Sequence, residues 1–255
     1  MASLGDSLER RLAFIDEIEA FAGPMDNRLV LDLGCGRHAL WTRAYAARGA
    51  EVVAIELDEA RCRAAQARLA EAASQGTGRV LGIIRADGER LPLRSRAVGF
   101  VHCAQVLEHV ENAAGFLAEL RRILIPGGHA YLTAINRFAL RDPHFGVVGV
   151  NYLPRALGDR VLRALGATSP EGQSLTRMHY FTRRGFQRLC AASGLEVVAD
   201  LKRNARIMRA GPLAGRLANA WGAVRSAAFH TVVRRPTHDT PGHDQHPAPW
   251  SRGQG

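Results

Sequence analysis

The segment VLDLGCGRHALW, residues 30–41, indicates an apolar strand, a tight glycine turn and the start of a helix. Gly34, Gly36 and Ala39 have the spacing of the dinucleotide-binding fingerprint, which allows alanine at its third position. Asp32, however, stands just before the first glycine, and a carboxylate there suits a cation better than a pyrophosphate. The turn therefore predicts a ligand site whose charge has to be decided from the residues around it.

Strands and helices alternate on both sides of this turn. Short apolar and β-branched runs predict strands at 28–33, 51–56, 80–85, 98–103 and 129–134, the last after a turn at Pro126-Gly127-Gly128. Helical periodicity predicts helices at 7–22, 39–48, 58–74 and 111–124, with Asp58 as the N-cap of the third. The alternation implies an α/β, doubly wound parallel sheet that is covered by helices on both faces.

The alternation pauses after Asn136. Residues 137–176 predict loops and one helix near 155–165, and a helix at 182–193 and a strand at 195–201 follow. A helix at 213–225 and a final strand at 229–234 complete the pattern. We expect a single domain over 1–235, with inserted segments at 137–176 and 202–226, and a disordered tail at 236–255.

The bulk composition limits the class of protein. The 255 residues carry a net charge of +10, and the stretch from Lys202 to Arg235 contains no acidic residue. Such a stretch is either a solvated surface or a contact face for anionic lipid or nucleic acid. The four cysteines lack CxxC spacing, which argues against a disulfide framework or a zinc site. Without a long apolar run or a signal-like start, we expect a cytoplasmic protein.

Four polar side chains, Asp32, Glu56, Asp87 and Gln105, lie at or just beyond predicted strand ends. Ligands of parallel α/β sheets bind outside the carboxyl ends of the strands, so these residues predict one pocket. S-adenosylmethionine carries an ammonium and a sulfonium cation and no phosphate, whereas NAD would bring its pyrophosphate next to Asp32. Glu56 can accept the ribose hydroxyls of either cofactor. The charge at Asp32 therefore favours S-adenosylmethionine.

Five segments carry a family resemblance: VLDLGCG, VVAIELD, RADGERLPL, VLEHV and RRILIPGGHAYLTAIN. In this order and spacing the chain resembles the class I S-adenosylmethionine-dependent methyltransferases, over about residues 28–136 strongly and 177–234 weakly. It is most similar to their small-molecule branch, which includes the ubiquinone- and menaquinone-biosynthesis enzymes. The resemblance implies a Rossmann-like, mostly parallel seven-stranded sheet and methyltransferase activity (EC 2.1.1.-). We expect the inserted segments 137–176 and 202–226 to cover the acceptor.

The resemblance also implies which residues hold the cofactor. The methionine end should lie against the glycine turn, the ribose on Glu56 and the sulfonium near Gln105. Asp87 should contact the adenine amino group, and Gly88 should leave room beside the ring. The implied cofactor residues are Asp32, Gly34, Gly36, Glu56, Asp87, Gly88 and Gln105.

Two positions depart from the family pattern. His38 stands at the usual third glycine, where we expect it to crowd the helix start, and Gly99 replaces an aspartate common in the fourth strand. Gln105, Glu108 and His109 would share one face of a helix, where a carboxylate and an imidazole could bind Mg²⁺. Some relatives carry a glutamate in place of Gln105. Without that carboxylate we expect no metal site and no need for a divalent metal in catalysis.

Methyl transfer from a sulfonium is an in-line displacement, to which the protein contributes mainly proximity and alignment. An alcohol or phenol acceptor must also lose a proton, and histidine suits that task near neutral pH. His109, His144 and His179 are alternative candidates for the base, and each also has a purely structural interpretation. The sequence does not choose among them.

The function that these patterns predict is methyl transfer to an O or N atom of a small or lipid-linked acceptor. In the predicted helix at 213–225, apolar residues gather on one face beside arginines, as in an interfacial helix at an anionic membrane, or as in a face packed on the sheet. The rival functions are an RNA methyltransferase, a non-catalytic cofactor-binding scaffold protein and an NAD oxidoreductase. No Asn/Asp-Pro-Pro-aromatic tetrapeptide occurs, so we do not expect a nucleic-acid partner.

Overall fold

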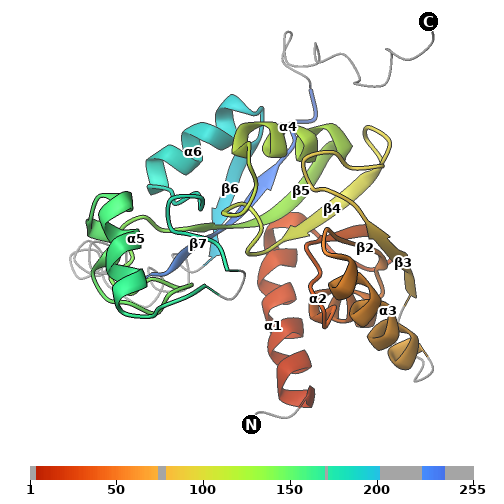
Figure 1. The fold of residues 1–255 in the computed structure, drawn as a ribbon. Helices are drawn as coiled ribbons and strands as arrows, with labels where there is room; N and C mark the ends of the chain where they lie inside the picture. The colour runs from red at the N-terminus through yellow and green to blue at the C-terminus, as the bar shows by residue number, and fades with distance from the viewer. Residues whose placement is uncertain (1–3, 74–78, 170–171, 202–225, 239–255) are drawn as a thin grey trace, which may run out of the picture.

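The computed structural model describes residues 4–73, 79–169, 172–201 and 226–238. Its centre is a seven-stranded sheet in the order β3-β2-β1-β4-β5-β7-β6 (Figure 1). Strands β1 to β5 are parallel, and β7 runs antiparallel to both of its neighbours, β5 and β6. The strands are β1 Leu29–Leu33, β2 Glu51–Glu56, β3 Arg79–Arg85, β4 Val98–Cys103, β5 Leu124–Ile135, β6 Glu196–Asp200 and β7 Ala228–Arg234.

Helices cover both faces of the sheet, with α4 and α6 above it and α1 and α2 below it in Figure 1. In β1, Leu31 and Leu33 join the core under α4 and α6, whereas Val30 joins the core with α1 and α2. This alternation in a strand buried on both faces is the pattern of a parallel α/β sheet. The helices are α1 Leu4–Ala22, α2 Leu40–Ala47, α3 Glu59–Ala73, α4 Ala113–Ile123, α5 Arg155–Ala164 and α6 Arg183–Ala192.

Local signals at the helix and strand ends decide most of these boundaries. The Asp58 carboxylate accepts a hydrogen bond of 2.8 Å from the Arg61 N–H, which confirms the predicted N-cap of α3. The start of β5 was predicted wrongly, because the strand begins at Leu124 and runs through the Pro-Gly-Gly segment. There the Gly127 N–H donates to the Arg235 carbonyl (3.0 Å) and the Arg235 N–H donates to the Gly128 carbonyl (2.8 Å). The chain after β7 therefore supplies the pairing that a sharp turn would have lacked.

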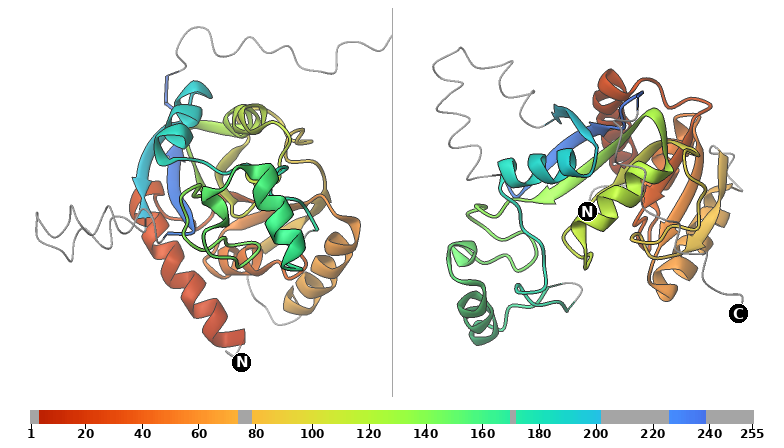
Figure 2. Two further views of the ribbon diagram at one scale, coloured as in Figure 1. Left: turned by 60° about the vertical axis from the view of Figure 1, so that its left-hand side comes forward. Right: turned by 90° about the horizontal axis from the view of Figure 1, so that it is seen from above.

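Residues 137–169 build a small unit between β5 and α6. It contains the 3-10 helix η1 Val150–Tyr152 and helix α5, and its Val150 and Leu162 form a separate small core with Leu175, which follows the unit in the chain. Figure 2 shows this unit beside the sheet from two further directions. Of the predicted segments, the helix at 213–225 and nearly all of the tail at 236–255 lie outside the described residues. No helix in the described ranges is long and apolar enough to cross a membrane.

Candidate functional site

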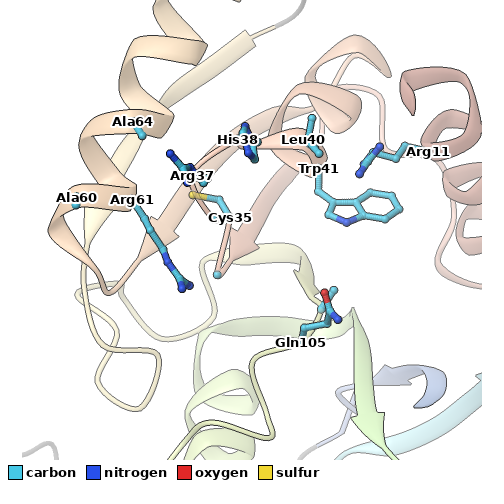
Figure 3. Close-up of a pocket in the computed structure, with 13 residues that line it drawn as sticks. Arg11, Cys35, Arg37, His38, Leu40, Trp41, Ala60, Arg61, Ala64 and Gln105 are labelled. Carbon is cyan, nitrogen blue, oxygen red and sulfur yellow. The ribbon is translucent and has the colours of Figure 1, made fainter. Parts of the chain in front are cut away.

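A cavity of about 540 Å³ opens at the carboxyl ends of β1 and β4. The glycine turn after β1 forms one wall, and Gln105 faces that turn from the segment after β4 (Figure 3). Arg11 of α1 and Arg61 of α3 stand on opposite sides of the turn. The lining residues are Arg11, Gly34, Cys35, Gly36, Arg37, His38, Leu40, Trp41, Ala60, Arg61, Ala64, Ala104 and Gln105.

The turn needs glycine for two different reasons. Gly34 has φ +79°, and a Cβ there would lie 2.4 Å from Cγ2 of Val106. Gly36 has φ +64°, but a Cβ there would meet no atom within 4 Å. The first glycine is therefore required by packing and backbone conformation, and the second by conformation alone on the protein side. The N–H of Gly34 holds the turn against β2 by donating to the Ile55 carbonyl (2.8 Å).

Asp32 lies beneath the turn and is 1% exposed. Its carboxylate accepts a hydrogen bond of 2.5 Å from the Thr42 hydroxyl, which ties the end of β1 to α2. Burial raises the pKa of Asp32 to about 6, the negative charge of Glu56 adds to the rise, and the hydrogen bonds from Thr42 oppose it. Asp32 is not among the residues that line the cavity, so it can act on a ligand there through its charge.

This raised pKa predicts a dependence of stability on pH. The folded-state pKa of Asp32, about 6, lies above its ordinary value of 3.8, so the folded state holds the proton more tightly. The contribution of Asp32 to the free energy of unfolding is therefore fully present below about pH 4. It is lost as the pH rises through about 6, by at most about 3 kcal/mol in the cofactor-free protein. We expect Asp32→Asn to remove this loss. Urea unfolding at pH 4.5 and 7.5 measures it, and equal pH dependence in both proteins would contradict the assignment.

Glu56, at the end of β2, connects the glycine turn to the start of α3. One carboxylate oxygen accepts from the Gly36 N–H (3.0 Å), and the other accepts from the N–H groups of Leu57 (2.9 Å) and Asp58 (3.0 Å). The residue is 7% exposed and does not line the cavity itself, but Gly36 does. Glu56 thus fixes the position of a cavity wall, and a ribose hydroxyl would have to share its oxygens with these donors.

Of the remaining predicted cofactor residues, Gln105 lines the cavity, whereas Asp87 and Gly88 are not among its lining residues. Asp87 is exposed, and its carboxylate accepts from the Glu89 N–H (2.9 Å). A Cβ on Gly88 would lie 2.8 Å from Cε2 of Phe116, so the small residue makes room for a core phenylalanine. Gln105 is exposed in the cavity, with φ 59° and its N–H donating to the Thr133 hydroxyl (2.7 Å).

The two departures His38 and Gly99 have structural explanations. The His38 side chain is exposed and lines the cavity, so the expectation that it crowds the helix start was wrong. Ala39 instead takes the left-handed conformation before α2, with φ 45°. A Cβ on Gly99 would lie 2.8 Å from Nε of Arg28, whose guanidinium donates to the Gly99 carbonyl (2.7 Å). Gly99 therefore leaves room for a half-buried arginine.

Sequence reasoning missed the arginines and the tryptophan of the cavity. The Arg11 guanidinium lies over the Trp41 ring at 5.3 Å from its centroid, which is the geometry of a cation–π contact. The Trp41 ring in turn lies 4.3 Å from that of His102, whose pKa burial lowers to about 3. Trp41 belongs to the quoted turn and could have been noticed there. Arg11 had no sequence signal, because only the packing of α1 near α2 brings it to the cavity.

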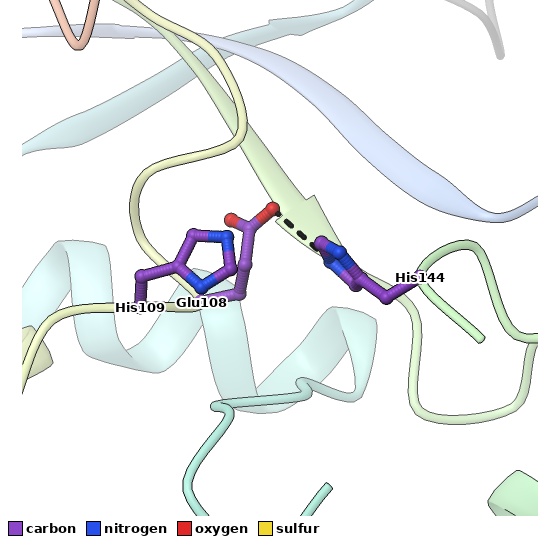
Figure 4. A group of neighbouring side chains, drawn as sticks. All are labelled: Glu108, His109 and His144. Carbon is purple, nitrogen blue, oxygen red and sulfur yellow. Dashed lines mark ion pairs between the residues drawn. The ribbon is translucent and has the colours of Figure 1, made fainter. Parts of the chain in front are cut away.

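A second group of polar side chains gathers around Glu108 (Figure 4). None of residues 105–109 is helical, and 107–109 form a turn, so the expected helical face with Gln105, Glu108 and His109 was wrong. Instead, the side chains of Glu108, His109 and His144 place one ligand atom each within 4.8 Å of one another, and such a set could hold a divalent cation. His179 contributes its backbone N–H, which donates to the Glu108 carbonyl (2.9 Å), while its ring stacks on Phe181.

Comparison with known proteins agrees with this architecture. Residues 31–132 match the family described as Methyltransferase domain. Across 89% of this chain and all of that one, the fold matches an S-adenosylmethionine-dependent methyltransferase from Mesorhizobium loti (TM-score 0.58, 19% identity). It also matches a putative sarcosine dimethylglycine methyltransferase from Galdieria sulphuraria (TM-score 0.58, 11% identity, 89% and 86% of the two chains). Residues 31–132 thus resemble a methyltransferase domain and the chain has the fold of these two structures, which confirms the predicted fold and the family resemblance.

Among curated proteins, the chain is similar to ubiquinone biosynthesis O-methyltransferases. The chain is 31% identical over 147 residues to a ubiquinone biosynthesis O-methyltransferase of Nitrosomonas europaea, covering 58% of this chain and 59% of the relative. It is 35% identical over 158 residues to the protein of that name from Pseudomonas aeruginosa, covering 58% and 62%. The match spans about three fifths of the length of these relatives.

Proposed function

We propose that this protein is an S-adenosylmethionine-dependent methyltransferase that moves a methyl group to an O or N atom of a small or lipid-linked acceptor. The observation that carries the proposal is the pair of buried carboxylates, Asp32 and Glu56, around a glycine turn that lines the cavity. Their mutual repulsion contributes to the raised pKa of Asp32. A cationic ligand relieves this repulsion, whereas a pyrophosphate adds to it.

The cavity residues have distinct roles in this proposal. The bound cofactor supplies an electrophilic methyl group on a sulfonium, and the protein aligns it with the acceptor. Gly34 and Gly36 let the backbone approach the cofactor, and Gln105 faces them. Arg11, held over Trp41, is suited to pair with the carboxylate of the methionine end. Glu56 holds the Gly36 backbone in place and offers its oxygens to the ribose.

The first prediction concerns the class of cofactor. Arg11, Arg37 and Arg61 line the same cavity and would suit a pyrophosphate, so a dinucleotide has to be included in the test. We expect S-adenosylhomocysteine to bind with a heat signal that saturates at one site, and NADH not to bind. Isothermal titration calorimetry measures both. Binding of NADH without binding of S-adenosylhomocysteine would overturn the proposed function.

A lipid-linked acceptor is supported by the surface of residues 137–165. Half of the large apolar side chains that are exposed among the described residues lie here, although this is a small part of the chain. Exposed apolar patches are typical of interaction sites, and the Phe138 and Tyr152 rings lie 6.5 Å apart here. Arginines accompany them, and Arg155, Arg160 and Arg163 lie on α5 itself. The six side chains are Phe138, Leu140, Val148, Tyr152, Leu157 and Leu165.

We therefore expect the protein to bind vesicles that contain anionic lipid. Apolar burial and attraction to negative headgroups act together at such a surface. Vesicle flotation measures the bound fraction, and Val148→Ser with Leu165→Ser should lower it several-fold. Leu57→Ser with Leu81→Ser is the matched control, since these side chains are similarly exposed near the other edge of the sheet. Replacing Arg209, Arg216 and Arg225 tests the basic segment separately. No binding to any vesicle would leave a soluble small molecule as the acceptor.

A further inference from the structure

Thr42 is a buried threonine in the first turn of α2, and its side chain is directed at Asp32. Thr42 is 0% exposed and Asp32 is 1% exposed, and the Thr42 hydroxyl donates to the Asp32 carboxylate over 2.5 Å. The backbone N–H of Thr42 also donates to this carboxylate, as the first N–H groups of a helix can because they have no acceptor within it. Thr42 thus supplies both of the hydrogen bonds that lower the pKa of Asp32.

The two residues adjoin the wall of the cavity. Asp32 comes two residues before Gly34 of the turn. Thr42 comes directly after Trp41, and both Gly34 and Trp41 line the cavity. Cys35 lines it as well; burial raises the pKa of its thiol far above the usual range, and the negative charge of Asp32 adds to this rise. The charge of Asp32 therefore reaches a group that a ligand in the cavity would contact.

We propose that Thr42 is a positioning residue for the cofactor: its hydroxyl keeps the Asp32 carboxylate ionised and fixed in place, so that the negative charge attracts the ammonium group of the methionine end. The inference rests on the proposed function and adds a residue to its site. Burial and the charge of Glu56 favour the neutral, protonated form of Asp32, which would attract no cation. Thr42 opposes this protonation because its hydroxyl donates to the charged form.

Most other titratable groups around Asp32 stay neutral between pH 5.5 and 8.5. His102 of β4 pairs with Asp32 of β1, and burial lowers the pKa of His102 to about 3. Burial raises the pKa of Tyr45 on α2 and that of Cys103 at the end of β4 well above their usual ranges. None of these three side chains therefore changes its charge in the range where Asp32 titrates.

The remaining groups are the same in every protein that the test compares. Glu56 faces Asp32 from β2, and four basic side chains line the cavity, namely Arg11, Arg37, His38 and Arg61. Since these groups are present in the wild type and in each variant, a difference between two proteins at one pH reports the substituted residue.

The experiment measures the affinity of the full chain for S-adenosylhomocysteine by calorimetry between pH 5.5 and 8.5. In the wild type the affinity should fall as the pH falls through about 6, because the ligand prefers the ionised carboxylate. Thr42→Val, which keeps the shape and loses the hydroxyl, should raise the midpoint of this fall by about one to two pH units. The dissociation constant should therefore be about 3- to 25-fold higher than in the wild type at pH 6.5, but within about twofold of it at pH 8.5.

Two further variants and a second ligand separate this role from packing. Thr42→Ser keeps the hydroxyl and should leave the midpoint within about half a pH unit of the wild type. Thr231→Val is the matched control, because Thr231 is a threonine of β7 that is 3% exposed and does not line the cavity. 5′-Methylthioadenosine has the nucleoside but no ammonium group. Its affinity for Thr42→Val and for the wild type should agree within about twofold at pH 6.5.

Failure of the wild type to bind S-adenosylhomocysteine would refute the proposed function itself. With that binding intact, any of four results would overturn the role of Thr42. They are a wild-type affinity that does not change between pH 5.5 and 8.5, an unchanged midpoint in Thr42→Val, a loss of affinity in that variant that is equal at pH 6.5 and 8.5, and an equal loss for 5′-methylthioadenosine.

Discussion

Replacing Glu56 by alanine should weaken the binding of S-adenosylhomocysteine at least about 30-fold, or roughly 2 kcal/mol. The carboxylate has two tasks at once. It is the predicted acceptor for the ribose hydroxyls, and it already accepts three backbone N–H groups from the glycine turn and the start of α3. Truncation removes the ribose contact and leaves these donors without their acceptor. The turn that lines the cavity is then no longer held in place.

Calorimetric titration gives the affinity, and urea unfolding gives the stability of the same variants. Glu56→Gln keeps one oxygen that can accept, so it should retain part of both and remain folded if the alanine variant does not. Glu59→Ala is the matched control, because Glu59 is exposed on α3 and forms surface ion pairs with Arg63 and Arg85. Such pairs contribute about 1 kcal/mol or less. An unchanged dissociation constant in Glu56→Ala would remove this residue from the cofactor site.

Most of the sheet could be predicted because its signals are local. Strand β2 is a β-branched run, and Asp58 caps the next helix with its own side chain, so both of its ends can be read within a few residues. The extent of β5 could not be read in this way. It depends on pairing with Arg235, more than a hundred residues further along the chain. The Pro-Gly-Gly segment at 126–128 therefore predicted a turn, whereas distant backbone supplies a pairing partner there.

In the candidate site, too, some features could be predicted from local sequence and others depend on distant residues. Asp32, Glu56 and Gln105 could be placed at one edge because parallel strands end there together, and this rule needs no side-chain detail. Their partners could not be predicted. Asp32 accepts from Thr42, and Glu56 reaches the Gly36 N–H only when β1 and β2 pair in their observed register. The approach of His144 to Glu108 depends on the inserted unit, which packs around its own small core and is distant from Glu108 in the sequence.

The different reasons for glycine at 34 and at 36 can be tested by comparing the stability of the two alanine variants. Gly34→Ala should lower the free energy of unfolding by about 2–4 kcal/mol, because the residue has φ +79° and the new Cβ would overlap Cγ2 of Val106 at 2.4 Å. Gly36→Ala is the matched control. It shares the strained backbone, with φ +64°, but its Cβ enters open space, so it should lose only the conformational part, about 1–2 kcal/mol.

The overlap at Gly34 predicts a coupling that backbone strain alone would not produce. In a double-mutant cycle, Val106→Ala should return at least about 1 kcal/mol of the stability lost in Gly34→Ala, since it removes the atom that the new methyl group meets. The same Val106→Ala change should return nothing in the Gly36→Ala background. Cofactor affinity should rank the two variants differently from stability. Gly36→Ala should weaken cofactor binding although it costs less stability, because an alanine side chain at 36 would occupy space at the cavity wall that a ligand needs. Purely additive effects at 34 and 106 would show that the turn tolerates the methyl group by moving, and the close approach of β1 to the β4 segment would then not explain the first glycine.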